Sequence, residues 1–378
     1  MTRQPHLIAG RATEAGTARY AGRAGRDVVP EHFRLTERGL RLASVGIGTY
    51  LGREDDATDE LYRRAIGRAL ERSVNVVDTA INYRHQRSER VIGAVLADAV
   101  ARRAVARDEL FVATKGGYVP FDVEIPRDPA AYFTETYLAS GIVGPDDVVG
   151  GSHCMTPRYL ADQIERSRTN LGLETLDLYY LHNPESQLEA VGRDEFMRRL
   201  RAAFELFEES VSAGKIARYG AATWNGYREP PGAPGLLALA DMVAAAREIG
   251  GPDHHFRAIQ LPYNLAMTEA FTRANQPIGK ETVSTLEAAS RLDVYVMASA
   301  SVYQGQLTHN LPPLIAEFLP DLSSDAQRAL QFVRSTPGIG TALVGMKAMS
   351  HVNENAGVAA HAPIPWERFK RLFTADAG

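Results

Sequence analysis

The sequence predicts an α/β fold, a (β/α)8 TIM barrel with an N-terminal β-hairpin and a long insertion after strand 3. Two observations lead to it: eight short apolar runs recur along the 378-residue chain, and helix-like segments separate them. Most runs are continuously apolar, as expected for parallel strands covered by helices on one face and packed inside a barrel on the other. The runs span residues 42–48, 74–80, 110–115, 176–182, 216–223, 256–264, 293–299 and 340–345.

The segments between the runs predict helices over 58–73, 88–103, 156–172 and 195–215. In the third of these, Thr156 precedes a proline, the order typical of an N-cap and a first-turn proline, and Gly172 stands where a helix should end. Ahead of the first strand, residues 32–45 predict a β-hairpin with its turn near Gly39, which would close the floor of the barrel.

The domain organisation expected is a flexible N-terminal arm over residues 1–31 and a single barrel domain over 32–378. The arm contains five arginines, with Glu14 as its only acidic residue before Asp27. Organelle transit peptides share this composition, but we expect a mobile tail or one that clasps another subunit.

The insertion over residues 116–156 is rich in Pro, Gly and aromatic residues and has no clear period. Structureless segments of this length are uncommon in compact domains and are often functional lids, and the aromatic content argues against disorder. We expect the insertion to fold over the active-site face, with Tyr118 near the substrate and His153 or Cys154 as further neighbours. The alternative is a contact between subunits.

The charge balance and composition exclude several classes of partner. With 42 basic and 46 acidic residues, the chain has no net positive charge to drive nucleic-acid binding. No apolar run approaches the roughly 20 residues that a membrane-spanning helix needs. A single cysteine, Cys154, excludes internal disulfides and fits a reducing compartment. We therefore expect a cytoplasmic monomer or homo-oligomer that acts on a small molecule, with no nucleic-acid or membrane partner.

Four polar groups of complementary chemistry follow the predicted strands. Asp78 and Tyr83 follow the second strand, Lys115 closes the third and His182 closes the fourth. Any one of them alone has a structural explanation, such as a helix cap or a hydrogen-bonded histidine in the core. A barrel, however, brings the carboxyl ends of its strands together on the face that carries the active site. Four such groups on that face indicate a catalytic centre.

The sequence resembles the aldo-keto reductase family over roughly residues 33–370. The matching segments are GIGTYLG, DTA followed by Tyr83 and SERVIG, TKGG at Lys115, LDLYYLHNPE at His182, YGAATWN, AIQLPYN and NENAG. The resemblance implies reversible hydride transfer between a nicotinamide cofactor and an aldehyde or ketone, or the corresponding alcohol, with sugar-like compounds among the substrates. NADP(H) is favoured over NAD(H), and would bind without a Rossmann domain, since GIGTYLG lacks the G-x-G-x-x-G spacing.

The resemblance implies a role for each of the four groups. Tyr83 would be the general acid and base. A free phenol, with a pKa of about 10, is a weak acid at neutral pH, so Lys115 would lower that pKa and Asp78 would hold Lys115 in place. A neutral His182 would hydrogen-bond the substrate oxygen. No metal is required.

The same resemblance implies the binding contacts. Substrate contacts are expected at Tyr50, Tyr118 and Trp224. Cofactor contacts are expected at Gly48, Thr49, Tyr50, Asp78, Thr223, Gln260, Ser299, Ser301, Gln304, Gly305, Gly345, Lys347, His351, Glu354 and Asn355.

The chain departs from the family pattern at three places. Ala222 and Thr223 stand where relatives have Ser-Asn beside the nicotinamide amide. Ser299 stands where many relatives stack a tyrosine ring on the nicotinamide. His351 occupies the usual arginine position at the 2′-phosphate, with Lys347 nearby.

Two other functions use the same residues. A Schiff-base lyase would employ Lys115 as its nucleophile, but would leave Asp78 and Tyr83 without a role. A cofactor-sensing subunit would bind the nucleotide and turn over little substrate.

Overall fold

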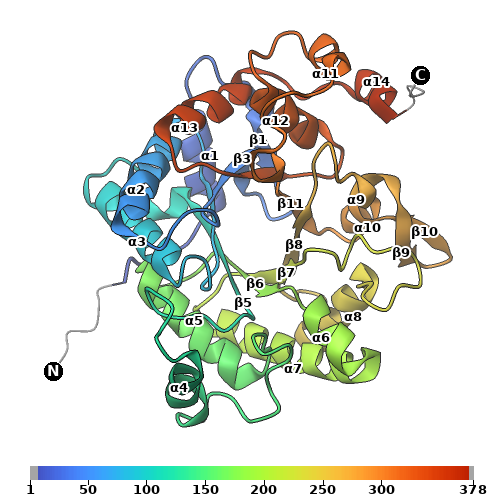
Figure 1. Ribbon diagram of the computed structural model, residues 1–378. Helices are drawn as coiled ribbons and strands as arrows, with labels where there is room; N and C mark the ends of the chain where they lie inside the picture. The colour runs from blue at the N-terminus through green and yellow to red at the C-terminus, as the bar shows by residue number, and fades with distance from the viewer. Residues whose placement is uncertain (1–6, 374–378) are drawn as a thin grey trace.

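A closed barrel of eight parallel strands forms the centre of the protein, as predicted. The computed structural model describes residues 7–373, and its barrel strands are hydrogen-bonded in the order β11-β12-β3-β4-β5-β6-β7-β8 (Figure 1). Each predicted run contains or overlaps one strand. The strands are β3 (Val45–Gly48), β4 (Val76–Asp78), β5 (Phe111–Gly116), β6 (Leu178–His182), β7 (Tyr219–Ala222), β8 (Phe256–Pro262), β11 (Tyr295–Ser299) and β12 (Thr341–Gly345).

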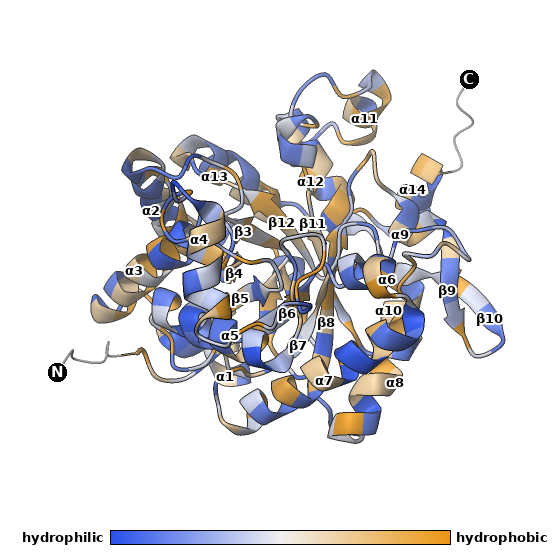
Figure 2. Ribbon diagram, turned by 60° about the horizontal axis from the view of Figure 1, so that its bottom comes forward, coloured by the Kyte–Doolittle hydropathy of each residue, from blue (hydrophilic) through white to orange (hydrophobic). Residues whose placement is uncertain are grey.

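Helices surround the barrel and cover its outer face. Figure 2 shows hydrophilic residues along outer helices such as α2 and hydrophobic residues on β11 and β12. One set of helices comprises α2 (Asp56–Glu71), α3 (Arg87–Ala101), α5 (Pro157–Leu171), α7 (Arg193–Ser212), α8 (Leu239–Gly250), α10 (Thr285–Arg291), α12 (Asp325–Ser335) and α13 (Met349–Ala356). The others are α1 (Glu14–Gly22), α4 (Pro129–Phe133), α6 (Glu185–Val191), α9 (Glu269–Thr272), α11 (Pro313–Phe318) and α14 (Trp366–Phe369). Single 3-10 or π-helical turns occur at Pro30–His32, Arg107–Glu109, Thr134–Leu138, Tyr303–Gly305, Gly357–Ala360 and Lys370–Phe373. Within residues 7–373, no helix combines the length and the apolar character needed to cross a membrane.

The four predicted helices are α2, α3, α5 and α7, each within a few residues of its expected bounds. Gly172 ends α5 in the left-handed conformation, with φ 63°, as expected for a C-terminal glycine. The expected side-chain cap at Thr156 is absent. Its hydroxyl lies 3.3 Å from Cys154 Sγ instead.

The predicted hairpin closes the floor of the barrel. Its strands β1 (Phe33–Leu35) and β2 (Arg41–Ala43) are antiparallel, with Arg34 opposite Leu42. Leu40 and Leu42 are buried in the cluster of side chains that fills the barrel interior. A second hairpin, β9 (Ala274–Ile278) and β10 (Glu281–Ser284), was not expected from the sequence.

The N-terminal segment differs from the flexible arm expected over residues 1–31. Its described part, from residue 7, packs against the base of the barrel. The Ala12 backbone N–H donates to Asp177 Oδ1 at 2.6 Å. Arg19, on α1, and Arg23, directly after it, form ion pairs with the fully buried carboxylate of Glu109 at 2.9 and 2.7 Å. Two of the five arginines that suggested a mobile tail therefore have a buried acidic partner, and residues 1–6 lie outside the described part of the chain.

The insertion packs mainly against α3 and α5. In Figure 1, α4 lies beyond α5 at the edge of the molecule. Tyr137 is fully buried, its ring centroid 6.0 Å from that of Tyr159 on α5. Gln86, at the start of α3, donates from Nε2 to the carbonyl of Phe121 at 2.9 Å. The bulk of the insertion is thus part of the outer core, and only its first residues reach the barrel mouth.

Candidate active site

A cavity of ≈ 1130 Å³ lies at the carboxyl ends of the barrel strands. Asp78, Tyr83 and His182 line it, and Lys115 is buried behind them. Each expected cofactor or substrate contact also lines it: Gly48, Thr49, Tyr50, Asp78, Tyr118, Thr223, Trp224, Gln260, Ser299, Ser301, Gln304, Gly305, Gly345, Lys347, His351, Glu354 and Asn355.

Lys115 and Asp78 form a buried ion pair on adjacent strands. Lys115 Nζ lies 2.7 Å from Asp78 Oδ2 and donates to the Thr79 carbonyl at 2.8 Å. Burial lowers the pKa of Lys115, and the carboxylate of Asp78 opposes that shift. The lysine is therefore held beneath the cavity floor, beside Asp78.

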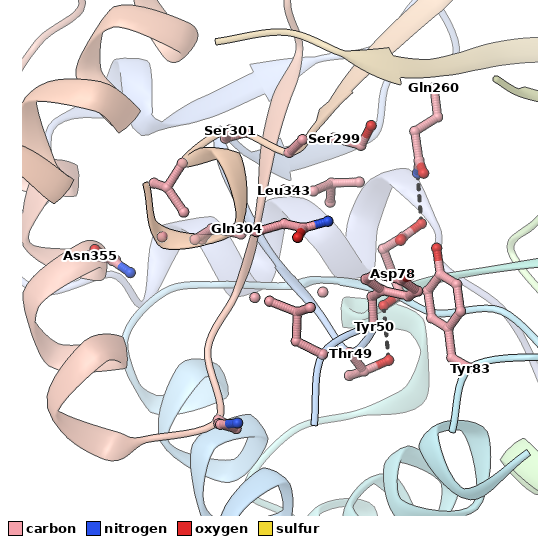
Figure 3. Close-up of a pocket in the computed structure, with 18 of the residues that line it drawn as sticks. Thr49, Tyr50, Asp78, Tyr83, Gln260, Ser299, Ser301, Gln304, Leu343 and Asn355 are labelled. Atoms are coloured by element: carbon pink, nitrogen blue, oxygen red, sulfur yellow. Dashed lines mark hydrogen bonds between the residues drawn. The ribbon is translucent and has the colours of Figure 1, made fainter. Parts of the chain in front are cut away.

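Asp78 is also held from across the barrel. Gln260, on β8, donates from Nε2 to Asp78 Oδ1 at 2.8 Å (Figure 3). Both carboxylate oxygens thus have a partner, one on β5 and one on β8. The carboxylate is fixed in orientation by strands on two sides of the barrel.

Tyr83 lies next to this pair, between Tyr50 and His182. Its hydroxyl is 3.5 Å from Lys115 Nζ, and its ring centroid is 5.0 Å from that of Tyr50 and 6.0 Å from that of His182. Burial raises the pKa of Tyr83 well above 10, and the charge of Asp78 raises it further. The expectation that Lys115 lowers this pKa is therefore not met. Because Lys115 is paired with Asp78, the phenol faces little net positive charge.

His182 is neutral and borders the cavity. Burial lowers the pKa of His182 well below 6.5, and the positive charge of Lys115 lowers it further. Its Nδ1 is buried and has no hydrogen-bond partner among the described residues. A neutral imidazole in this position can hydrogen-bond a ligand in the cavity.

The end of the insertion supports His182 from behind. His153 Nε2 donates to the His182 carbonyl at 2.7 Å, and Gln187 Nε2 donates to His153 Nδ1 at 3.0 Å. A Cβ at Gly117 would lie 2.8 Å from the same carbonyl, so only glycine fits there. The expectation of substrate contact fails for His153 and Cys154, because both are buried outside the cavity lining.

Glu185 positions the loop after β7. Its Oε1 accepts hydrogen bonds from the backbone N–H groups of Trp224 and Asn225, at 2.7 and 3.1 Å. Burial raises the pKa of this carboxyl group, and the backbone donors oppose the shift. Thr223, at the start of the loop, keeps a buried hydroxyl without a partner among the described residues. Sequence analysis missed Glu185, although it ends the LHNPE motif.

The opposite end of the cavity is formed by β12 and α13. Figure 3 shows Asn355 at this end and Tyr83 at the other, with Gln304 between them. Asn355 Oδ1 is buried and has no partner among the described residues. Lys347 and His351 are exposed beside it. A long polar ligand would thus find the ammonium group of Lys347 and the imidazole of His351 at this end, and Tyr83 and His182 at the other.

Several lining residues were missed by the sequence analysis. Part of this set lies in the loop after β11, where Ala300 and Gln304 adopt positive φ angles of 52° and 53° without the glycine that usually signals such a turn. The full set is Leu51, Tyr62, Asn82, Asn183, Ala300, Val302, Gln306, Thr308, His309, Ala326, Leu343 and Val344.

Residues 44–228, which carry Asp78, Tyr83, Lys115 and His182, match the model of the Aldo/keto reductase family. The matched segment covers 185 of the 378 residues. Aldo-keto reductase AKR2E4 of Bombyx mori is 36% identical over 145 residues, which cover 38% of this chain and 35% of the relative. The match thus spans about a third of that relative's length.

Solved structures of aldo-keto reductases share the fold. An aldo/keto reductase from Klebsiella pneumoniae, in complex with NADP and acetate, superposes with a TM-score of 0.60 at 20% identity, over 91% of this chain and 96% of that one. The glycerol dehydrogenase AKR11B4 from Gluconobacter oxydans gives a TM-score of 0.63 at 19% identity, over 92% of this chain and 95% of that one.

The three departures from the aldo-keto reductase pattern all fall on the cavity wall. Ala222, Ser299 and His351 each line it. Ser299 leaves its position without a ring, whereas Tyr50 and Trp224 expose 57% and 40% of their surface at the cavity. Two exposed aromatic side chains of the cavity therefore come from the loops after β3 and β7.

Proposed function

We propose that the protein is an NAD(P)H-dependent oxidoreductase that reduces an aldehyde or ketone to an alcohol. The observation that carries this proposal is the placement of Tyr83 and His182 on one cavity wall, with the Lys115–Asp78 pair directly behind. Carbonyl reduction needs a proton donor where negative charge develops on oxygen, and this arrangement supplies a phenol backed by a cation.

Tyr83 donates its proton to the carbonyl oxygen as that oxygen gains negative charge. Its raised pKa keeps the phenol protonated at neutral pH, which suits the direction of reduction. Lys115 Nζ, 3.5 Å away, lies beside the phenolate that remains. His182 hydrogen-bonds the same substrate oxygen and thereby orients the substrate carbonyl. Preorganised donors of this kind are typically worth about 2.7–4 kcal/mol each in barrier lowering.

The cavity fits a nicotinamide dinucleotide, which supplies the hydride when bound. Two buried polar atoms lack partners among the described residues, Thr223 Oγ1 beside the catalytic residues and Asn355 Oδ1 at the far end. Thr223 would hold the nicotinamide amide, and Lys347 and His351 would face the 2′-phosphate of NADP(H). Two similar structures from Klebsiella pneumoniae were determined in complex with NADP and with NADPH, which supports the choice of NADP(H).

A Schiff-base lyase is disfavoured by the position of Lys115. Its side chain is fully buried, paired with Asp78, and outside the cavity lining. A lysine nucleophile must reach the substrate carbonyl. The cofactor-sensing subunit would share the binding site and differ in turnover.

The test is Tyr83→Phe, assayed by NADPH absorbance with a panel of aldehydes, ketones and sugars. We expect turnover to fall more than tenfold, while NADPH binding measured by fluorescence stays close to that of the wild type. Tyr180→Phe is the matched control, because its hydroxyl is buried in the barrel core without a partner among the described residues. Turnover above a tenth of wild type would overturn the role of Tyr83. A wild-type protein that binds NADPH and reduces nothing on the panel would be the sensing subunit.

A further inference from the structure

One of the three arginines buried in the described part of the chain differs from the other two. Arg84 pairs with Asp59 at 2.5 Å, and Arg107 pairs with Asp177 at 2.7 Å. Arg334, near the end of α12, is 1% exposed and forms no ion pair with a described carboxylate. Each of the three keeps one buried guanidinium nitrogen without a partner among the described residues, so the missing carboxylate is what sets Arg334 apart.

Uncharged groups surround the guanidinium of Arg334. Nη1 donates to the backbone carbonyls of Val358 and His361 at 2.7 and 2.6 Å and to Gln331 Oε1 at 2.8 Å. Nε donates to Ser44 Oγ at 3.0 Å. Nη2 is the buried nitrogen without a partner in the described structure. These oxygens carry only partial negative charges, so they satisfy hydrogen bonds without neutralising the cation.

A second positive charge lies beside the first. Arg34, on β1 of the floor hairpin, donates from Nη2 to the backbone carbonyl of Arg334 at 2.7 Å, and β1 lies next to α12 (Figure 1). Arg34 Nε is also buried and without a partner among the described residues. Burial, together with the positive charge of Arg34, lowers the pKa of Arg334 to about 9. Both guanidinium groups are therefore charged at neutral pH.

The titratable groups around the two arginines do not balance this charge. Glu31 acts on both, but it is exposed and forms no ion pair with either. Burial lowers the pKa of His32 to about 4 and raises the pKa of Tyr295 above 10, so both side chains are neutral at pH 7. Arg34 and Arg334 thus face one exposed negative charge, and an unbalanced buried charge is costly.

We propose that a small monovalent inorganic anion, of the size and charge of chloride, binds at the barrel floor between Nη2 of Arg334 and Nε of Arg34. The anion accepts a hydrogen bond from each nitrogen and balances one of the two positive charges. A bulky anion is excluded because Arg334 is buried.

The anion would join two distant parts of the chain. Arg34 belongs to the floor hairpin, whereas Arg334 holds the backbone carbonyls of Val358 and His361 near the C-terminus. A ligand that binds only the folded state stabilises it. The inference does not depend on the proposed reductase function, since the floor lies at the opposite end of the barrel from the catalytic cavity.

The experiment compares thermal unfolding in sodium chloride and in sodium gluconate, each at about 100 mM, so that ionic strength is constant and the second anion is too bulky for a buried site. Arg334→Met removes four hydrogen bonds as well as the charge, and it could fail to fold. Arg34→Met removes the second donor and leaves those bonds in place. Arg41→Met, at an exposed arginine of the same hairpin without an ion pair among the described residues, is the matched control.

We expect the Tm of the wild type and of Arg41→Met to be about 2–4 °C higher in chloride than in gluconate, as for an anion present at roughly ten times its Kd. Arg34→Met, and Arg334→Met if it folds, should lose most of this difference. No difference in the wild type, or a difference in Arg34→Met as large as in Arg41→Met, would overturn the inference.

Bromide provides a direct second measurement, because its anomalous scattering distinguishes it from water. A crystal grown in sodium bromide should show an anomalous peak in contact with Nη2 of Arg334. Peaks only at exposed arginines would indicate an adventitious ion only, and would overturn the inference, as would a water molecule at Nη2.

Discussion

Lys115 is a buried cation whose nearest compensating charge is Asp78, at 2.7 Å. Asp78→Asn keeps the shape of the side chain but leaves the lysine without its ion-pair partner. Removing one partner of a buried pair typically costs about 3–5 kcal/mol. We expect the free energy of unfolding, measured by urea denaturation, to fall by about this amount.

The double variant Asp78→Asn with Lys115→Met is the control for this prediction. It removes both charges, and should therefore be more stable than Asp78→Asn alone. Equal stability of the single and double variants would show that the buried lysine does not depend on Asp78.

Lys347 provides a second prediction at the scale of one residue. If it contacts the 2′-phosphate, Lys347→Ala loses a charge-assisted hydrogen bond, worth roughly 1.5–3 kcal/mol. We expect the Kd for NADPH to rise at least about tenfold, while the Kd for NADH changes little. Lys370→Ala, at a half-buried lysine paired with Glu367 and outside the cavity lining, is the matched control. Equal weakening of both cofactors would place Lys347 outside the phosphate site.

Residues that act through their side chains at strand ends were predictable from the sequence. Asp78, Lys115 and His182 stand at or next to the last residues of apolar runs, and that position directs them to one face of the barrel. Glu185 and His153 form hydrogen bonds with backbone groups. Contacts of this kind leave no recognisable motif in the sequence. The direction of the pKa shift of Tyr83 was predicted wrongly. The sequence indicated the positive charge of Lys115, but not that the carboxylate of Asp78 balances it closely.

At the scale of the elements, the packing of the insertion predicts a contribution to stability. The insertion was expected to fold over the active-site face, but the structure buries Tyr137 of this segment completely. Tyr137→Ala should lower the free energy of unfolding by about 3–5 kcal/mol, the usual cost of truncating a buried aromatic residue. Thermal or urea unfolding measures the loss, and NADPH affinity should be preserved. A variant as stable as the wild type would contradict the packing of the insertion against α5.

The barrel strands were predictable because each is a short apolar run bounded by polar residues. The insertion and the loop after β11 were not, since their conformations depend on tertiary contacts. Val123, for example, adopts a φ of +67° with its N–H donated to the carbonyl of His85. No local sequence signal predicts such a contact, because the two residues lie in loops that are far apart in the sequence.

For the whole molecule, two buried histidines predict a dependence of stability on pH. Burial lowers the pKa of His32 to about 4 and that of His153 to about 4. His32 donates from Nε2 to the Ser73 carbonyl at 2.8 Å, joining the floor hairpin to the barrel, and His153 joins the insertion to β6. Both are neutral in the folded protein and have a pKa near 6.5 when unfolded.

Between pH 4 and pH 6.5 the unfolded chain binds more protons than the folded protein. The contribution of the two histidines to stability should therefore be complete above pH 6.5 and fall as the pH drops from 6.5 to 4. Each histidine contributes at most roughly 3 kcal/mol to this loss. Urea unfolding of the wild type, His32→Gln and His153→Gln at pH 7 and pH 4.5 measures it. Each variant should lose less stability than the wild type between the two pH values. A wild-type stability that is the same at both would contradict the prediction.

The barrel is closed by the pairing of β12 with β3, which joins Gly345 to Gly48 near opposite ends of the chain. During synthesis, β3 leaves the ribosome long before its partner exists. Until the last strand emerges, the nascent sheet has an unpaired edge at β3, and such edges favour association with other chains. A ribosome stalled before residue 341 would thus present an open sheet, and chaperones should bind these nascent chains more strongly than the completed protein.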